Sequence, residues 1–117
     1  MEYVFRVQDK KGRGPFAPGF SRQWVICRPD HNNLRPWFEE FGRVDQEILD
    51  GCFGGSACKT IHQLRRWFTK PEYKKLKKFG YKAYKVKVNR VIAESDVQCF
   101  VTKRDPFCDG AKAIALY

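Results

Sequence analysis

Two helix-start signals follow one another in the middle of the chain, and they constrain the fold more than any other feature. Thr60 stands three residues before Gln63, and Thr69 stands three residues before Glu72. Each pair matches the capping box, in which the Thr side chain and the Gln or Glu side chain satisfy two backbone amides at the start of a helix. The sequence therefore predicts two short helices, one after each box.

Both predicted helices carry an apolar stripe. In IHQLRRWF the stripe consists of Ile61, Leu64, Trp67 and Phe68. In EYKKLKKFG it consists of Tyr73, Leu76 and Phe79, with Pro71 near the first turn and Gly80 as the C-terminal cap. Pro is favoured at the first helical position and Gly just past the last, so these punctuation residues support the second helix in particular.

The segment that follows, YKAYKVKVNRVIA, changes to a period of two. Tyr84, Val86 and Val88 fall on one face, and Lys85 and Lys87 fall on the other. Successive side chains of a strand point to opposite faces, so this pattern predicts a half-buried strand.

Other strands are predicted on both sides of the helices. They are EYVFRVQ near the N-terminus, VQCFVTKR and a last strand in AKAIALY. With two or three short helices between them, this order indicates an α+β fold with a mainly antiparallel sheet.

The segments between the first strand and the first capping box are less regular. DKKGRGPFAPGFS is expected to be a loop, because it contains three Gly and two Pro. WVIC fits a short strand or a helix start, and LRPWFEEFG fits a helical turn after Pro36 or an irregular aromatic segment. RVDQEILDG has helical spacing with Gly51 as its stop, and CFGGSACK is expected to be a Gly-rich turn.

The length of 117 residues fits one domain, 1–117, without a separate linker. A chain with 43% apolar and 15% aromatic residues can bury a core without a metal or a disulfide. The core is expected to include Val4, Trp24, Leu64, Trp67, Phe68, Leu76, Tyr84, Val86, Val88, Cys99 and Val101.

Location and redox state follow from what the sequence contains. No run approaches 18 apolar residues, and the N-terminus has no basic n-region or apolar h-region, so neither a transmembrane helix nor a signal peptide is expected. A cytoplasmic location is then expected, with the five cysteines as reduced thiols and Cys27 and Cys99 in the core.

The excess positive charge is confined to one part of the chain. The net charge is +10, but residues 59–90 hold twelve Lys or Arg and one acid, which gives +11, and the remaining residues sum to −1. Such a block creates a directional field that attracts an anionic partner. The residues expected to bind it are Arg65, Arg66, Lys70, Lys74, Lys75, Lys77, Lys78, Lys82, Lys85, Lys87 and Arg90.

Two interpretations of this block remain open. One is a solvated amphipathic helix beside an exposed sheet face, where lysine is common. The other is contact with a nucleic-acid backbone or an acidic nucleoprotein complex. Lysine outnumbers arginine in the block, which favours point-charge contacts over base recognition. No named nucleic-acid-binding motif is present.

No catalytic constellation, cofactor motif or metal motif is evident, which favours a non-enzymatic protein without cofactor or metal. The loop DKKGRGPFAPGFS has Gly and basic residues suited to a phosphate, but lacks the established phosphate-loop patterns. Cys52 and Cys58 are six residues apart and no CxxC occurs, so a plain structural role is favoured over zinc for these cysteines.

The order of motifs resembles a family of uncharacterised small phage and prophage proteins. VFRVQDKKGRGPF is similar to their opening pattern hYRhxDxxGxGPY, and FGGSACKTIHQLRRWF to a segment that ends in QLxxWF. GYKAYKVKV and QCFVTKR match two later strands of the same family. The resemblance implies a phage origin and, by association, an accessory protein that binds host machinery, including nucleic-acid-handling or anti-phage defence complexes.

An alternative resemblance belongs to another functional class. Arg6, Ser21 and either Glu94 or Gln98 follow the Arg–Ser–Glu order of ADP-ribosyltransferases. That resemblance implies that the Arg and Ser help to hold NAD and that the acid polarises the ribose. The chain has no Ser-Thr-Ser strand and no Glu-x-Glu or Gln-x-Glu, and Gln98 lacks the required carboxylate.

Overall fold

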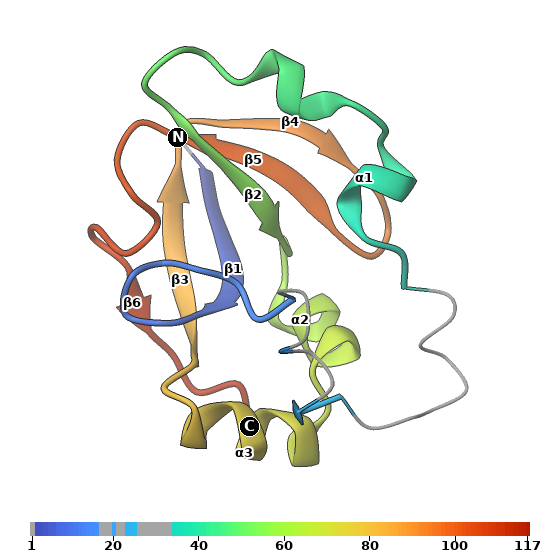
Figure 1. Ribbon diagram of the computed structural model, residues 1–117, viewed down its shortest axis with the longest axis vertical. Helices are drawn as coiled ribbons and strands as arrows, with labels where there is room; N and C mark the ends of the chain where they lie inside the picture. The colour runs from blue at the N-terminus through green and yellow to red at the C-terminus, as the bar shows by residue number, and fades with distance from the viewer. Residues whose placement is uncertain (1, 17–19, 21–22, 26–33) are drawn as a thin grey trace.

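Two three-stranded antiparallel sheets form the framework of the protein (Figure 1). The computed structural model describes residues 2–16, 20, 23–25 and 34–117. In chain order the elements are β1 (Glu2–Gln8), α1 (Trp37–Glu40), the 3-10 helix η3 (Val44–Glu47), β2 (Phe53–Ala57), α2 (Ile61–Trp67), α3 (Lys70–Lys78), β3 (Lys82–Val88), β4 (Arg90–Glu94), β5 (Cys99–Lys103) and β6 (Lys112–Ala113). The α+β class with antiparallel pairing and short helices, as predicted, is confirmed.

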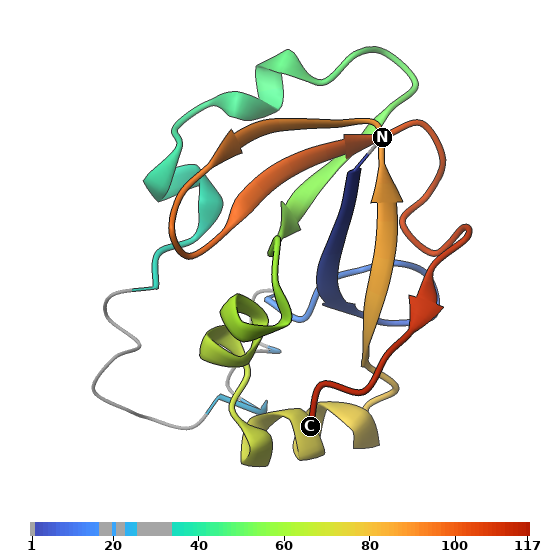
Figure 2. The same ribbon diagram turned by 180° about the vertical axis from the view of Figure 1, so that it is seen from behind.

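Within the described residues, one isolated backbone bridge joins the two sheets. One sheet has the order β1-β3-β6 and the other has the order β2-β5-β4. Phe5 of β1 and Cys58, just after β2, exchange backbone hydrogen bonds of 2.7 and 2.8 Å. Beyond this bridge the two strands diverge, so the sheets splay apart (Figures 1 and 2).

The alternation of strand residues places a different core on each face of the β1-β3-β6 sheet. Val7 and Ala83 pack in a cluster with Leu64 of α2 and Leu76 of α3. On the opposite face, Val4, Val86 and Val88 pack against Cys99 and Val101 of β5. The helices therefore cover one face and the second sheet covers the other. All of the predicted core residues are buried except Tyr84, which is half-buried.

Both capping boxes form as the sequence predicts. Thr60 Oγ1 accepts from the Gln63 amide at 3.0 Å, and the Gln63 side chain accepts from the Thr60 amide at 3.3 Å. At the start of α3, the Glu72 carboxylate accepts from the Thr69 amide at 3.0 Å and from its hydroxyl at 2.8 Å. Gly80 ends α3 with φ of +87°, a conformation that favours glycine.

Three segments differ from the prediction. CFGGSACK is not a turn, because Phe53–Ala57 forms β2; its glycines leave room for Ile48, Phe100, Phe107 and Arg6, which press against the strand. YKAYKVKVNRVIA is not one strand, because Asn89 separates β3 from β4 and the chain changes sheets there. RVDQEILDG forms only the short helix η3, and Leu49 beyond it is 71% exposed.

Smaller differences concern the ends of elements. Phe79 was expected to face inward, but it lies past the end of α3 and is 47% exposed. The last strand is limited to Lys112–Ala113, whereas LRPWFEEFG forms the expected helical turn as α1. Of WVIC, Trp24 and Val25 belong to neither a strand nor an α-helix, and the other two residues, including Cys27, lie outside the described residues. In the described segments no helix is long and apolar enough to span a bilayer.

Candidate functional site

The basic residues singled out from the sequence all lie on the surface. Each of the eleven is exposed. We call those of α3 the helix lysines: Lys70, Lys74, Lys75, Lys77 and Lys78. We call those of β3 the strand lysines: Lys82, Lys85 and Lys87. Within the described residues, neither group forms an ion pair with an acidic side chain.

α3 and β3 are neighbours, so the helix lysines and the strand lysines lie on adjacent elements. The Ala83 amide of β3 donates to the Tyr73 hydroxyl of α3 at 2.9 Å, and this contact places the helix beside the start of the strand. Further along β3, the ammonium groups of Lys85 and Lys87 lie 4.7 and 6.0 Å from the centre of the Tyr3 ring. Tyr3 is itself 52% exposed, so the site offers an aromatic ring as well as positive charge.

The three arginines of the predicted set lie on other elements. Arg65 of α2 donates from Nε to the Leu116 carbonyl at 2.8 Å and lies over the Tyr117 ring at 5.5 Å. Arg66 is also on α2, and Arg90 begins β4 in the other sheet. The predicted basic residues are therefore spread over four elements. Most of them are the helix lysines of α3 and the strand lysines of β3.

The structure adds basic residues that the sequence analysis did not select. A hollow of about 550 Å³ is lined by Lys85 and Lys87 together with Lys103, Arg104 and Lys112. Lys112 of β6 lies directly opposite Lys85 of β3. Lys103 is the last residue of β5, and Arg104 follows it. The acids Asp105 and Asp109 also line the hollow. The Lys-Arg pair that closes VTKR is the sequence signal that would have found two of these residues.

A second concavity lies where β1 and β2 diverge. It has a volume of about 430 Å³. Its described lining includes Arg6 of β1, Ser56 of β2 and Gln98 ahead of β5. Aromatic side chains form much of the remaining wall, namely Phe16, Trp37, Phe38, Trp67 and Phe68.

Arg6 is the charged residue among the described lining residues of this cavity. Its Nη1 donates to the Ser56 carbonyl at 3.0 Å and its Nη2 donates to the Gly12 carbonyl at 3.1 Å. The guanidinium carbon lies 4.1 Å from the centre of the Phe107 ring. Burial lowers the pKa of Arg6 from its ordinary value to about 10, although the negative charge of Asp9 opposes the shift. Arg6 thus replaces the backbone pairing that β1 and β2 lack beyond their bridge.

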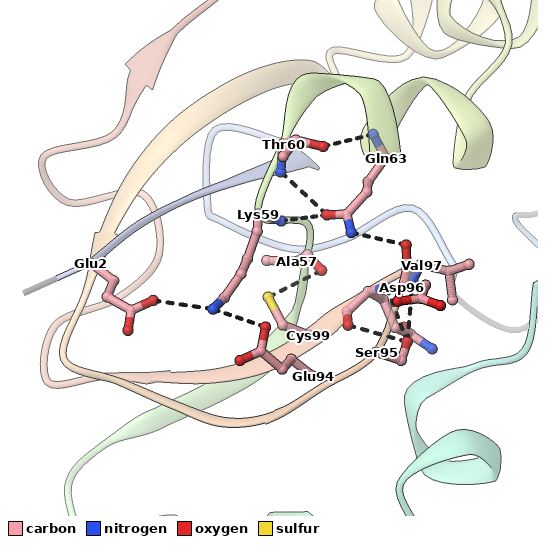
Figure 3. Close-up of polar contacts among 11 residues, drawn as sticks. Glu2, Ala57, Lys59, Thr60, Gln63, Glu94, Ser95, Asp96, Val97 and Cys99 are labelled. Atoms are coloured by element: carbon pink, nitrogen blue, oxygen red, sulfur yellow. Dashed lines mark hydrogen bonds and ion pairs between the residues drawn. The ribbon is translucent and has the colours of Figure 1, made fainter.

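The position of α2 beside the cavity is fixed by polar contacts at its N-terminus (Figure 3). Gln63 Nε2 donates to the Asp96 carbonyl at 2.9 Å, which ties the helix to the turn between β4 and β5. Lys59, just before the helix, pairs with Glu94 at 2.9 Å and with Glu2 at 3.7 Å. Trp67, at the other end of α2, donates from its indole to the Val97 carbonyl at 2.8 Å.

The residues of the predicted Arg–Ser–Glu order are only partly brought together. Arg6 and Gln98 line the cavity, whereas Glu94 is exposed and paired with Lys59. Ser21 lies outside the described residues, and Ser56, which the sequence analysis did not select, lines the cavity beside Arg6. Gln98 is 4% exposed and donates to Glu40 Oε1 at 2.8 Å and to the Arg35 carbonyl at 2.7 Å.

The described cysteines are free thiols. Burial raises the pKa of Cys58 far above its ordinary value and raises the pKa of Cys99 to about 12, with Lys59 opposing the shift of Cys99. Cys52 is half-buried, and it does not join Cys58 in a metal site: over the described ranges, no three His, Cys, Asp or Glu side chains are grouped to hold a metal ion.

Comparison with known proteins identifies one family. The family model described as Bacteriophage T4 Y00F protein matches residues 1–109. This match covers most of the chain and confirms the resemblance to small phage proteins. No curated protein and no solved structure matches the chain.

Proposed function

The chain belongs to the bacteriophage T4 Y00F protein family, and from this premise we propose that it is a phage accessory protein that binds an anionic host partner. The proposed contact surface consists of the helix lysines, the strand lysines and the basic residues of the adjoining hollow. The proposed partner is a nucleic acid, free or within a host complex that handles nucleic acid, such as a defence complex.

The observation that carries this proposal is the exposure of all eleven predicted basic residues, with no acid paired to the helix or strand lysines among the described residues. A surface meant only for solubility commonly mixes both signs of charge. Here residues 59–90 hold a single acid, Glu72, and its side chain is fully buried. The charge of the helix lysines and strand lysines is therefore left for an external anion.

The chemistry of the surface indicates which part of a nucleic acid it contacts. Lysine ammonium groups bind phosphates as point charges and lack the planar fork of arginine that recognises guanine. Tyr3, held under Lys85 and Lys87, offers a ring on which an unpaired base can stack. The surface is therefore suited to backbone contacts with little sequence preference, and to single strands over duplexes.

The test is fluorescence anisotropy with labelled single- and double-stranded DNA and RNA at roughly 50 and 200 mM salt. We expect binding that weakens steeply with salt, because each neutralised phosphate releases counterions. The variant Lys74→Glu/Lys78→Glu/Lys85→Glu should lose binding and keep its circular dichroism spectrum, since all three side chains are exposed.

Two results would remove the nucleic-acid proposal. One is retained affinity in the folded triple variant. The other is no binding by the unmodified protein at the lower salt, which would direct the search to an acidic host protein.

A second candidate function is NAD binding of the ADP-ribosyltransferase kind. The specific observation in its favour is that Arg6 and Ser56 line one cavity at the divergence of β1 and β2. Gln98 lines the same cavity, and an amide cannot replace the acid of that family. This candidate predicts that NAD binds, measured by calorimetry, and that Arg6→Gln abolishes binding. Release of nicotinamide that depends on Arg6 would make the protein an enzyme, whereas no binding of NAD would remove the candidate.

A further inference from the structure

Arg6 is a buried cation without an acidic partner in the described residues. Its side chain and backbone together are 8% exposed, and its Nε has no hydrogen-bond partner. Burying a charge is costly unless it is paired and hydrogen-bonded. A buried guanidinium that also lines a cavity therefore requires an explanation beyond packing.

The orientation of the guanidinium group is fixed from several sides. Phe107 covers one side of its plane, and the Ser56 and Gly12 carbonyls each accept one hydrogen bond. Gly55 lies so close that an added Cβ would stand 2.5 Å from Nη1. These contacts use two of the five N–H donors of an arginine. The group is thus held in one place with donors still unused.

The neighbouring acids are occupied elsewhere. Asp9 is held by Arg13, whose Nε lies 3.0 Å from Oδ2 and whose amide donates to Oδ1 at 2.9 Å. Glu40 accepts from Gln98 on another part of the cavity wall and from the Ser95 hydroxyl. Neither carboxylate forms an ion pair with Arg6, so the cavity has a positive charge available on its wall.

The rest of the cavity is suited to a flat apolar group. Its walls carry five aromatic side chains, of which Trp67 is fixed by its indole hydrogen bond and Trp37 lies 4.5 Å from the Phe100 ring, centre to centre. The volume of about 430 Å³ falls within the range of small-molecule sites. Aromatic side chains pack favourably against another ring, either stacked or edge to face.

We propose that this cavity binds a small ligand that combines an aromatic ring with an anionic group, the anion at Arg6 and the ring against the aromatic walls. The inference shares its cavity with the second candidate function but does not require NAD. A nucleotide supplies this combination through its phosphate, and an aromatic acid supplies it through its carboxylate. Both present oxygens that match the guanidinium donors.

The test compares four probes by tryptophan fluorescence and calorimetry: AMP, adenosine, benzoate and inorganic phosphate. We expect AMP or benzoate to bind at least about tenfold more tightly than adenosine or phosphate, because only the first two combine a ring and an anion. Binding of AMP but not of benzoate indicates that the ligand is a nucleotide. Binding of benzoate but not of AMP indicates that it is an aromatic acid. Equal affinity for AMP and adenosine, together with no benzoate binding, overturns the inference. So does the absence of binding by both anionic ring compounds up to about 5 mM.

Two variants locate the site. Arg6→Gln should weaken binding of the anionic probe by at least about tenfold, and an unchanged affinity in a folded Arg6→Gln protein overturns the inference. Should Arg6→Gln fail to fold, Phe38→Ala replaces it, because Phe38 lines the cavity and is 56% exposed. Unchanged binding of the anionic probe by Phe38→Ala then overturns the inference.

The matched control is Lys74→Glu/Lys78→Glu on α3. It should leave AMP or benzoate binding intact while weakening nucleic-acid binding. NAD is measured as a separate probe, so its failure to bind removes the second candidate function without affecting this inference.

Discussion

At the scale of single residues, the absence of a side chain at position 55 allows Arg6 to occupy its place. A Cβ there would stand 2.5 Å from Arg6 Nη1 and 3.2 Å from Phe107 Cε2. The Phe107 ring is buried, and the guanidinium is held by two carbonyls, so neither neighbour can move freely. We expect Gly55→Ala to lower the free energy of unfolding by about 1–3 kcal/mol, measured by urea denaturation.

The control for this prediction lies on the same cavity. An added Cβ at Gly14 would meet Arg6 Nη2 at 3.8 Å, an ordinary contact distance. Gly14→Ala should therefore change the free energy of unfolding by no more than about 0.5 kcal/mol. Equal destabilisation by the two variants would show that Arg6 is not confined as described.

The buried thiols make a second prediction at this scale. Burial raises the pKa of Cys58 and of Cys99, the latter to about 12, so at pH 8 Cys99 has on the order of a thousandfold less thiolate than an ordinary cysteine, and the thiolate of Cys58 is suppressed in the same direction. Iodoacetamide should modify the half-buried Cys52 and Cys108 first, as followed by peptide mass spectrometry. The rate at Cys99 should rise about tenfold per pH unit up to its pKa. Early modification of Cys58 or Cys99 at pH 8 would contradict their burial.

At the scale of elements, α2 depends on its N-terminal residues. Thr60→Ala removes the acceptor of the Gln63 amide and should lower the free energy of unfolding by about 1 kcal/mol, as N-cap truncations do. Gln63→Ala should cost more, because Gln63 also donates to the Asp96 carbonyl across to the β4–β5 turn. Urea denaturation of the two variants measures this difference. Thr60→Ser is the control, because it keeps the hydroxyl that accepts from the Gln63 amide. If Thr60→Ser lowered the free energy of unfolding as much as Thr60→Ala does, the capping role of Thr60 would be excluded.

The elements also show what sequence reasoning can reach. Both capping boxes are local, since each depends on two residues three positions apart, and both helices were predicted for that reason. Gly54 and Gly55 form a strand because they pair with Thr102 and Val101 of β5, far along the chain, so composition alone indicated a turn. The break at Asn89 is equally non-local, because its amide donates to the Thr102 carbonyl of another strand.

The candidate sites follow the same division. The exposure of the candidate lysines could be predicted, because the alternation on β3 and the apolar stripe of α3 set it locally. The cavity was not found, because nothing within EYVFRVQ indicates that Arg6 will lie opposite Ser56, fifty residues later. Arg104 and Lys112 likewise join the hollow only through strand pairing.

At the scale of the whole molecule, the positions of the sheets separate the basic residues into distinct regions. α3 lies across one end of β3, while Arg90 begins β4 beyond the other end (Figures 1 and 2). At about 3.3 Å per residue, the seven residues of β3 span about 20 Å. Since exposed charges are screened over about 10 Å at 0.1 M salt, the helix lysines and Arg90 contribute separately to the field, with the strand lysines between them.

This separation makes the final prediction, which concerns the salt dependence of nucleic-acid binding. Lys85→Gln/Lys87→Gln removes two phosphate-binding charges of the hollow, so the slope of log affinity against log salt should become shallower by about 2. Arg90→Gln removes a charge that does not line the hollow and belongs to the other sheet, so the slope should stay unchanged. Anisotropy titrations at several salt concentrations measure both slopes. If Arg90→Gln made the slope shallower and Lys85→Gln/Lys87→Gln left it unchanged, the contact surface would lie on β4 instead of β3.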